Sequence, residues 1–523
     1  MGFWNLYFAV KLYLYAVGDL RPIWWLNLLF ALLLLVPLPK RWMRVTRLVL
    51  AIVAGTVLIY HESDLPPFSY VLRQIPGLST FSASYMIELA HRIVTPAVIY
   101  VPIIVVLAYL LINRWVRVST FVLVAMLGVC LWEGMDALVA KSGVQPGVAV
   151  AHANTGAAAN DATGGYDQQL AAFYAAEKGR KVNFSPASSD PNAQFDIIVL
   201  HICSLSWDDL DVVNMHDNAL FQRFDFVFKN FSSAASYSGP AAIRVLRAAC
   251  GQQQHRDLYS PEDAGCHLFA DLAAAGYGVQ ALLNHDGQFD DFRGLVIREI
   301  AVPGVQLESN EGLPMAMREF DGSRLVGDYD ALERWYKQRL AKGGGPVALY
   351  YNTVTLHDGN RLLNSNMSSL QSYPVRMSKL VNDIDRLIDL IAQSGRKAAI
   401  VFVPEHGAAL RGDSRQIAGM REIPTPRIIH VPVGVTLVGL PGHNDGTRKT
   451  VTIDTPTSYL ALGQLLSKLV ADSPFRDGAP PLSQYAADLP QTRMIGENEN
   501  TVTMTTPDGY VIHTSDGVWV EGK

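Results

Sequence analysis

Five residues that could carry out chemistry follow closely after predicted β-strands: Cys203, Ser238, His357, Glu405 and His406. Thiolate, carboxylate and imidazole groups are ligands that zinc prefers, and a serine can attack phosphorus when it is activated. Ligands of open α/β sheets bind beyond the carboxyl ends of the strands, so residues far apart in the sequence can meet there. The combination therefore indicates a shared site more strongly than any one residue does.

Ser238 stands where a helix is expected to begin. Gly239 and Pro240 follow it, and an Ala- and Leu-rich run ends before Gly251, which is the pattern of a capped helix. The N–H groups and the dipole at a helix N-terminus favour an anion, which suits a serine that attacks phosphorus. On this segment alone, an ordinary N-cap serine is the alternative.

The other residues also have ordinary explanations when each is taken alone. Cys203 could be a small buried hydrophobic residue, and His357 a loop histidine. The Glu405-His406-Gly407 step could be a surface turn, although its glycine would allow a tight turn close to a metal ion. His285 and Asp286 follow another strand-like run and could face the site, with a loop as the alternative.

The elements that must position these residues are short β-branched and aromatic runs that alternate with helical stretches. This pattern predicts an α/β domain with a buried, mostly parallel central sheet. The runs that precede the candidate residues are Phe195–Ile202, Phe224–Phe228, Val347–Leu356 and Ala398–Val403. Further on, we expect a structural helix at Pro456–Val470, with Thr455 as its N-cap, and a three-stranded meander at Val502–Val520.

The first 140 residues have a different pattern, because apolar runs recur there at close to the roughly 20 residues that cross about 30 Å of hydrocarbon. We expect about five membrane-spanning helices, the first being the weakest because it is short and contains Lys11. The runs are Phe3–Val17, Pro22–Pro37, Val45–Tyr60, Thr95–Ile112 and Ser119–Ala137.

The distribution of charge orients these helices. Lys and Arg cluster at 40–47 and 114–117, which predicts that both loops are cytoplasmic and that residues 61–92 and the C-terminal domain are outside. The first 145 residues carry 11 Lys and Arg against six Asp and Glu, whereas the remainder carries 32 against 42. Phosphate binding needs a basic face, so a nucleic-acid partner is excluded for the acidic part.

Between the two parts, residues 141–195 are rich in Ala, Gly, Asn, Asp and Ser and are predicted to be a flexible linker, with a short helix possible at Tyr166–Lys178. The domains are therefore expected at 1–140, 141–195 and 196–523. Of the four cysteines, Cys250 and Cys266 bracket a polar loop and are expected to form a disulfide in an exported domain. Cys130 lies in an apolar run, which leaves Cys203 unbridged.

The motifs LHICSLSWDDL at 200–210, NFSSAASYSGPA at 230–241 and VFVPEHGAAL at 401–410 resemble those of a known family. The chain is similar to the phosphoethanolamine transferases of the alkaline phosphatase/sulfatase superfamily, and within it to the cellulose phosphoethanolamine transferases, the G subunits of bacterial cellulose-synthesis systems. The resemblance covers essentially the whole chain. In the wider superfamily the first strand ends in an acidic ligand and the later motif is Asp-His-Gly, whereas Cys203 and Glu405 here match the cellulose branch.

The resemblance implies a bound zinc ion. Its ligands would be Cys203, Ser238, Glu405 and His406. His357 would protonate the leaving alkoxide or deprotonate the sugar, unless it belongs to a second metal site. Arg421 would bind phosphate oxygens or make a surface salt bridge, and Tyr237 would line the pocket.

The implied reaction moves phosphoethanolamine from phosphatidylethanolamine to glucose 6-hydroxyls of cellulose through a covalent Ser238 intermediate. The protein would lie in the bacterial inner membrane as a multi-pass protein, with its C-terminal domain in the periplasm and with subunits of the cellulose synthase complex as partners. Two enzymatic alternatives stay open, a lipid A phosphoethanolamine transferase and a phosphoglycerol transferase. A subunit that chiefly scaffolds the cellulose synthase is a third.

Overall fold

The computed structural model describes residues 2–17, 20, 22–63, 80–94, 96–142, 165–441 and 448–522 of the chain. The chain forms two compact units. The first comprises Met1–Ser79 and Ile87–Ala153, and the second comprises Thr80–Met86 and Asn154–Lys523. Parts of the expected exported loop at 61–92 and of the expected linker, including 143–164, lie outside the described residues.

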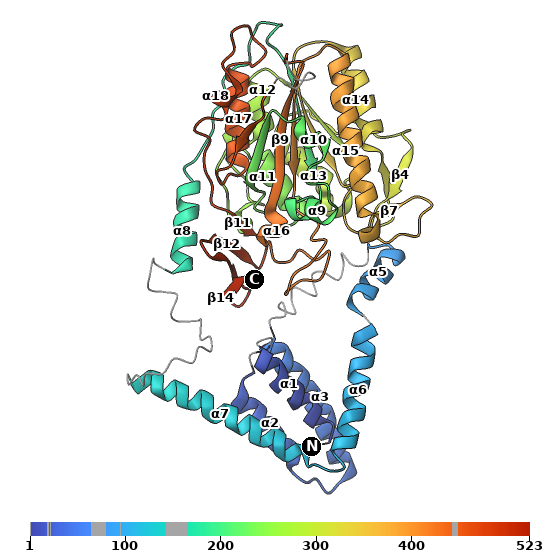
Figure 1. The fold of residues 1–523 in the computed structure, drawn as a ribbon, viewed down its shortest axis with the longest axis vertical. Helices are drawn as coiled ribbons and strands as arrows, with labels where there is room; N and C mark the ends of the chain where they lie inside the picture. Colours follow the sequence, from blue (N-terminus) through green and yellow to red (C-terminus); the bar gives the residue numbers. More distant parts are fainter. Residues whose placement is uncertain are drawn as a thin grey trace. The chain divides into compact units, whose positions relative to one another are not determined.

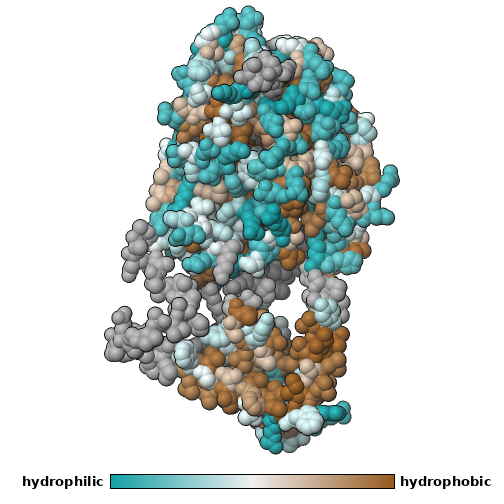
Figure 2. Space-filling view, in the orientation of Figure 1, coloured by the Kyte–Doolittle hydropathy of each residue, from teal (hydrophilic) through white to brown (hydrophobic). Residues whose placement is uncertain are grey.

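The first unit is helical. Its helices are α1 (Trp4–Val17), α2 (Trp24–Leu35), α3 (Arg41–Glu62), α5 (Ala83–Ile93, its first residues belonging to the second unit), α6 (Pro96–Ile112) and α7 (Val118–Ser142). On the face shown in Figure 2, hydrophobic residues make up most of the surface of this unit. Among the described residues, α3 is the one helix that is long and apolar enough to cross a membrane. The apolar parts of α2, α6 and α7 are shorter, so the five-span bundle is not confirmed and stays a prediction.

Lys11, which weakened the first apolar run in the sequence, is fully buried in the first unit. Its ammonium group forms an ion pair with Glu62 of α3 and donates a hydrogen bond to Asn27 Oδ1 of α2 at 2.5 Å. Asn27 also donates to Glu62 Oε1 at 2.5 Å. Three helices therefore share one buried polar network, and each charge in it has a partner of opposite sign.

The second unit is built on a seven-stranded sheet. In spatial order its strands are β10 (Val451–Ile453), β2 (Phe226–Ser232), β9 (His430–Val438), β8 (Ala398–Pro404), β1 (Asp196–Ile202), β6 (Val347–Thr353) and β3 (Gly278–Leu283). All strands except β9 run in the same direction, which confirms the mostly parallel sheet. Strand β9 is antiparallel because only a loop and the short α16 (Pro426–Ile429) connect it to β8, with no crossover helix that could carry the chain back.

Helices cover both faces of this sheet, as α14 and α15 on one side and α12 and α17 on the other show in Figure 1. The longer helices are α8 (Tyr166–Glu177), α11 (Ser238–Leu246), α13 (Phe292–Ile300), α14 (Asp328–Lys342), α15 (Ser369–Gln393) and α17 (Tyr459–Ala471). The shorter ones are α9 (Trp207–Val212), α10 (Ala219–Gln222), α12 (Leu268–Ala274) and α18 (Leu482–Tyr485). Because both faces are covered, the central strands are buried along their whole length.

Two smaller sheets complete the unit. One consists of β5 (Arg324–Val326), β4 (Met315–Arg318) and β7 (Arg361–Leu362). The other consists of β11 (Ile495–Glu497), β12 (Val502–Thr506), β13 (Gly509–His513) and β14 (Trp519–Gly522). The expected C-terminal meander is therefore one strand larger, because β11 pairs with β12. Helix α17 begins three residues later than Pro456, with Ser458 rather than Thr455 at its N-cap.

The described part of the expected linker, from residue 165 onward, is folded as part of the second unit. Trp519 Nε1 donates to Asp167 Oδ1 of α8 at 2.8 Å, and Val182 N donates to Ala249 O at 2.8 Å. Leu170 and Phe173 of α8 pack against the core of the small sheet that contains β12. The apolar residues of α8 thus bury enough surface to fold this part of the segment, which the overall composition of residues 141–195 did not indicate.

Candidate metal centre at the strand ends

The register of the parallel strands brings Cys203 and Glu405 together. Ile202, the last residue of β1, pairs with Thr353 of β6 and with Pro404 of β8. The backbone ladder continues one step beyond the strands, because Cys203 N donates to Thr353 O and Glu405 N donates to Ile202 O. Residues 203 and 405 therefore leave adjacent strands at the same edge of the sheet.

Cys203, Glu405 and His406 form a cluster whose possible ligand atoms all lie within 4.8 Å of one another. All three side chains are fully buried. Ser238 Oγ lies 3.5 Å from Cys203 Sγ, and His406 Nε2 lies 4.0 Å from it. The structure therefore brings together the four residues expected to bind zinc.

The donor set fits a zinc ion. One sulfur, one nitrogen and two oxygen donors suit zinc better than magnesium or calcium, which prefer oxygen ligands alone. Burial raises the pKa of the Cys203 thiol and of the Glu405 carboxyl, so ionising either group is costly without a cation nearby. Glu405 Oε2 is buried and makes no hydrogen bond among the described residues, which leaves it available as a ligand.

His406 is held with its Nε2 atom towards the cluster. Its Nδ1–H donates to Gly407 O at 2.9 Å, which leaves the Nε2 lone pair for a metal ion. Burial first, and then the positive charge of Arg421, lower the pKa of His406, so that its imidazole is neutral. A neutral imidazole is the form that coordinates metals.

Ser238 is the first residue of α11, and Tyr237 is the N-cap. The side chain of Ser238 is therefore not the helix cap that the ordinary explanation required, and it faces Cys203 instead. The N–H groups of Ser238 and Gly239, the first two residues of α11, have no acceptor within the helix, so they are available to an anion beside Ser238.

Arg421 and Tyr237 lie beside the cluster. Arg421 is buried, and its Nη1 donates to Ser204 Oγ at 2.8 Å and lies 3.4 Å from His406 Nδ1. Its guanidinium group lies over the Tyr237 ring, 5.6 Å from the ring centre, and Tyr237 Oη donates to Glu422 Oε1 at 2.6 Å. Arg421 is thus a buried cation beside the cluster and makes no surface salt bridge among the described residues.

His357 lies near the cluster, close enough that a positive charge on its imidazole would lower the pKa of His406. Its Nδ1–H donates to Asp358 O at 2.6 Å, and its ring packs on Phe320 with 4.6 Å between ring centres. Burial lowers the pKa of His357 to about 4, an effect that the charge of Arg421 reinforces. At neutral pH His357 is therefore a neutral base.

The sequence patterns missed the residues that orient Glu405. Asn352 of β6 donates to Glu405 Oε1 at 2.5 Å and accepts from His285 Nε2 at 3.0 Å. His201 of β1 is fully buried, with Nδ1 3.7 Å from Glu405 Oε1. The sequence signal that could have identified Asn352 and His201 is that each is a polar residue within an otherwise apolar strand. His285, for which the sequence left both a place at the site and a place in a loop open, is linked to the site through Asn352.

The turn after β8 is held by the segment after β1. Asp209 Oδ2 accepts hydrogen bonds from Ser206 N, Ser206 Oγ and Ala408 N at 2.7–2.9 Å. A Cβ atom on Gly407 would lie 2.7 Å from Ser206 Oγ, so only glycine fits there. The WDDL and EHGA motifs therefore form one structural unit that fixes His406.

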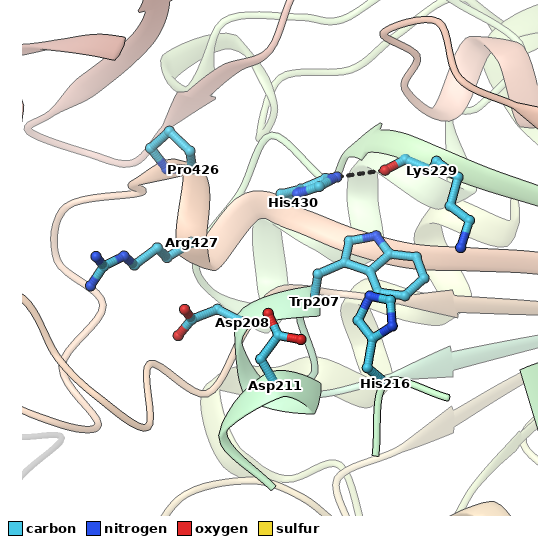
Figure 3. A pocket seen from close by; sticks show the side chains of 8 residues that line it. All are labelled: Trp207, Asp208, Asp211, His216, Lys229, Pro426, Arg427 and His430. Carbon is cyan, nitrogen blue, oxygen red and sulfur yellow. Dashed lines mark hydrogen bonds between the residues drawn. The ribbon is translucent and has the colours of Figure 1, made fainter. Parts of the chain in front are cut away.

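A cavity of about 480 Å³ lies beside this turn. Its walls are Trp207, Asp208, Asp211, His216, Lys229, Pro426, Arg427 and His430 (Figure 3). The Trp207 ring lies close to both the His216 ring and the Lys229 ammonium group. Because Trp207 begins α9 four residues after Cys203, the cavity and the metal-ligand cluster share the turn that follows β1.

Comparisons with known proteins give consistent results along the chain. Residues 4–131 match the model of the cellulose biosynthesis protein BcsG N-terminal domain, and residues 149–519 match that of the C-terminal domain. The cellulose biosynthesis protein BcsG of Salmonella typhimurium is 35% identical over 541 residues, which cover 99% of this chain and 95% of that protein. The protein of the same name from Escherichia coli is 34% identical over 538 residues, with the same coverage.

Solved structures are more distant. A protein of the alkaline phosphatase superfamily from Vibrio parahaemolyticus is 13% identical, with a TM-score of 0.46 over 68% of this chain and 91% of that one. The C-terminal periplasmic domain of EcEptC from Escherichia coli, in a complex with Zn, is 14% identical, with a TM-score of 0.44 over 64% and 97%.

Proposed function

We propose, because the chain belongs to the family of the cellulose biosynthesis protein BcsG, that it is a zinc-dependent phosphoethanolamine transferase acting in cellulose biosynthesis. The single observation that carries the chemistry is the convergence of Cys203, Ser238, Glu405 and His406 at one edge of the sheet. These residues come from three separate stretches of the chain, and a shared ion and substrate explain why they meet.

Zinc would be held by Cys203 Sγ, Ser238 Oγ, Glu405 and His406 Nε2. When bound, it would act as a Lewis acid that favours the alkoxide form of a serine and offsets charge on a phosphoryl group. Asn352 and Gly407 O keep Glu405 and His406 in the ligating orientation.

In the first step, Ser238 Oγ attacks the phosphorus of phosphatidylethanolamine. The new Oγ–P bond forms as the bond from phosphorus to the diacylglycerol oxygen breaks, and the proton that Ser238 Oγ loses is transferred to that oxygen. The N–H groups of Ser238 and Gly239 at the start of α11 and the guanidinium group of Arg421 would bind the phosphate oxygens.

In the second step, a glucose 6-hydroxyl of cellulose attacks the phosphorus and Ser238 Oγ leaves. His357 is our candidate to accept the hydroxyl proton, because its Nδ1–H donates to Asp358 O and its Nε2 lone pair is left free. Tyr237 would line the donor pocket, since its ring packs on Arg421 and its hydroxyl is fixed by Glu422.

The proposal places the protein in the bacterial inner membrane, with residues 196–523 as the periplasmic enzyme domain, 141–195 as the connection and 1–140 as the membrane part. The apolar helix α3, the basic segments at 40–47 and 114–117, and the Cys250–Cys266 disulfide support this arrangement. The family's name supports cellulose as the acceptor, and the cellulose synthase complex as the partner.

The test compares cellulose from cells that carry the wild-type protein, Ser238→Ala or Ser233→Ala. Ser233 is a matched control, because it lies in the same connection between β2 and α11 and donates to Ala235 O rather than facing the cluster. We expect Ser238→Ala to abolish the phosphoethanolamine signal in solid-state NMR of the cellulose, with normal levels of protein and synthase. Retained modification in Ser238→Ala would refute the mechanism, and loss of the synthase itself would indicate a scaffolding subunit.

A further inference from the structure

A short segment from between the apolar helices is part of the second unit. Thr80–Met86 lies in the sequence between α3 and α6, yet it is grouped with the strands and helices that hold the metal-ligand cluster. Ser82 N donates to Phe320 O at 2.9 Å, and Arg361 Nη2 donates to Ser84 O at 3.3 Å. The Phe81 ring meets the edge of the Phe320 ring, with 5.6 Å between centres. Both backbone and side-chain contacts therefore fix the segment.

Tyr85 is a residue of this segment that contacts the turn after His357. It is buried, and its hydroxyl donates to Asp358 Oδ2, also buried, at 2.9 Å. The next residue, Gly359, has a φ of +87°, and a Cβ atom there would lie 2.5 Å from Phe320 Cβ and 2.9 Å from Tyr85 Cε2. Tyr85 and Phe320 thus pack directly on the turn that carries Asp358.

The same turn orients His357. The Asp358 carbonyl accepts the His357 Nδ1–H at 2.6 Å, which leaves Nε2 as the atom that can exchange a proton. Phe320 covers the His357 ring, and the Tyr85 ring packs on Phe320 with 6.3 Å between centres. Tyr85 therefore supports both the group that bonds to the imidazole and the ring that stacks on it.

We propose that Tyr85 is a positioning residue of the transferase, which holds the Asp358 turn and thereby the Nε2 atom of His357 in the orientation for proton transfer. This inference rests on the proposed function, since it assigns His357 a role in the reaction. It also means that the catalytic site is incomplete without a residue from the N-terminal part of the chain. A small displacement of a catalytic group lowers the rate of the chemical step more than it lowers substrate binding.

The experiment uses the purified full-length protein with zinc and a cello-oligosaccharide as the acceptor, and measures steady-state release of diacylglycerol from phosphatidylethanolamine in mixed micelles, so that each turnover includes the second step. Tyr85→Phe keeps the ring and removes the hydrogen bond. We expect kcat to fall about tenfold, with KM within about twofold of the wild type. Asp358→Ala should act through the same contact, so the Tyr85→Phe/Asp358→Ala double variant should be no slower than the slower single variant.

The matched control is Tyr174→Phe. Tyr174 is buried as well, and its hydroxyl donates to a carboxylate, Glu497 Oε2, at the same distance of 2.9 Å. Both tyrosine variants should lower Tm, but only Tyr85→Phe should lower kcat.

A kcat of Tyr85→Phe within twofold of the wild type, or losses that multiply in the double variant, would overturn the role of Tyr85. Failure of the proposed function looks different, because the wild type and Ser238→Ala would then release diacylglycerol equally.

Discussion

Replacing Cys203 with alanine tests the candidate metal centre as a whole. Cys203 is fully buried, and burial together with the Glu405 charge raises the pKa of its thiol, so the thiol is protonated at neutral pH without a metal ion. Zinc binding must displace that proton, so the apparent binding constant should rise about tenfold per pH unit for each proton released.

Loss of a group that only hydrogen-bonds to a metal ligand can weaken metal binding by up to ~100-fold. Loss of the thiol, which is itself a ligand, should weaken zinc binding by at least this factor. That loss removes about 2.7 kcal/mol of the zinc-dependent stabilisation of the folded protein. Calorimetric titrations between pH 6 and 8, with Tm measured with and without zinc, would give both quantities. Cys130→Ala is the matched control, since Cys130 is the other cysteine outside the disulfide. Full zinc occupancy and an unchanged pH slope in Cys203→Ala would show that the thiol is only a packed strand-end residue.

Replacing Cys250 and Cys266 with serine should lower the free energy of unfolding by about 3 kcal/mol, measured by denaturant titration, while zinc occupancy stays unchanged. His357 has a pKa of about 4 in the folded protein, below its unfolded value, so unfolding takes up a proton there and stability falls as pH drops from about 6.5 towards 4. His357→Gln should flatten that part of the stability–pH profile, and an unchanged profile would contradict the burial of the imidazole. Gly407→Ala should force its new Cβ against Ser206 Oγ, cost about 1–3 kcal/mol and lower zinc occupancy, which metal analysis and thermal unfolding would measure.

The strand ends could be predicted from the sequence because each strand is a short apolar run followed at once by a polar residue. The runs before Cys203 and Glu405 became β1 and β8, and the direction of crossover connections placed both residues at one edge. The antiparallel β9 could not be predicted, since an apolar run carries no sign of its direction.

Other parts of the site depend on contacts that local patterns do not encode. Asn352 and His201 lie inside strands, where the sequence shows only that polar residues interrupt apolar runs. The bond from Tyr85 to Asp358 joins positions 273 residues apart. No periodicity or motif connects two such positions, so the structure was needed to find it.

The hydrogen bonds of Asp209 have a consequence for how such chains diverge. Ser206 caps α9 in a capping box with Asp209, and the Asp209 carboxylate also accepts from Ala408 N, so one carboxylate stabilises the loops after β1 and β8. A substitution in either loop changes the constraint on the other. Among relatives, we therefore expect the residues at positions 206, 209 and 407 to covary, and a chain that inherits only one of the two loops by recombination should not assemble the turn around His406.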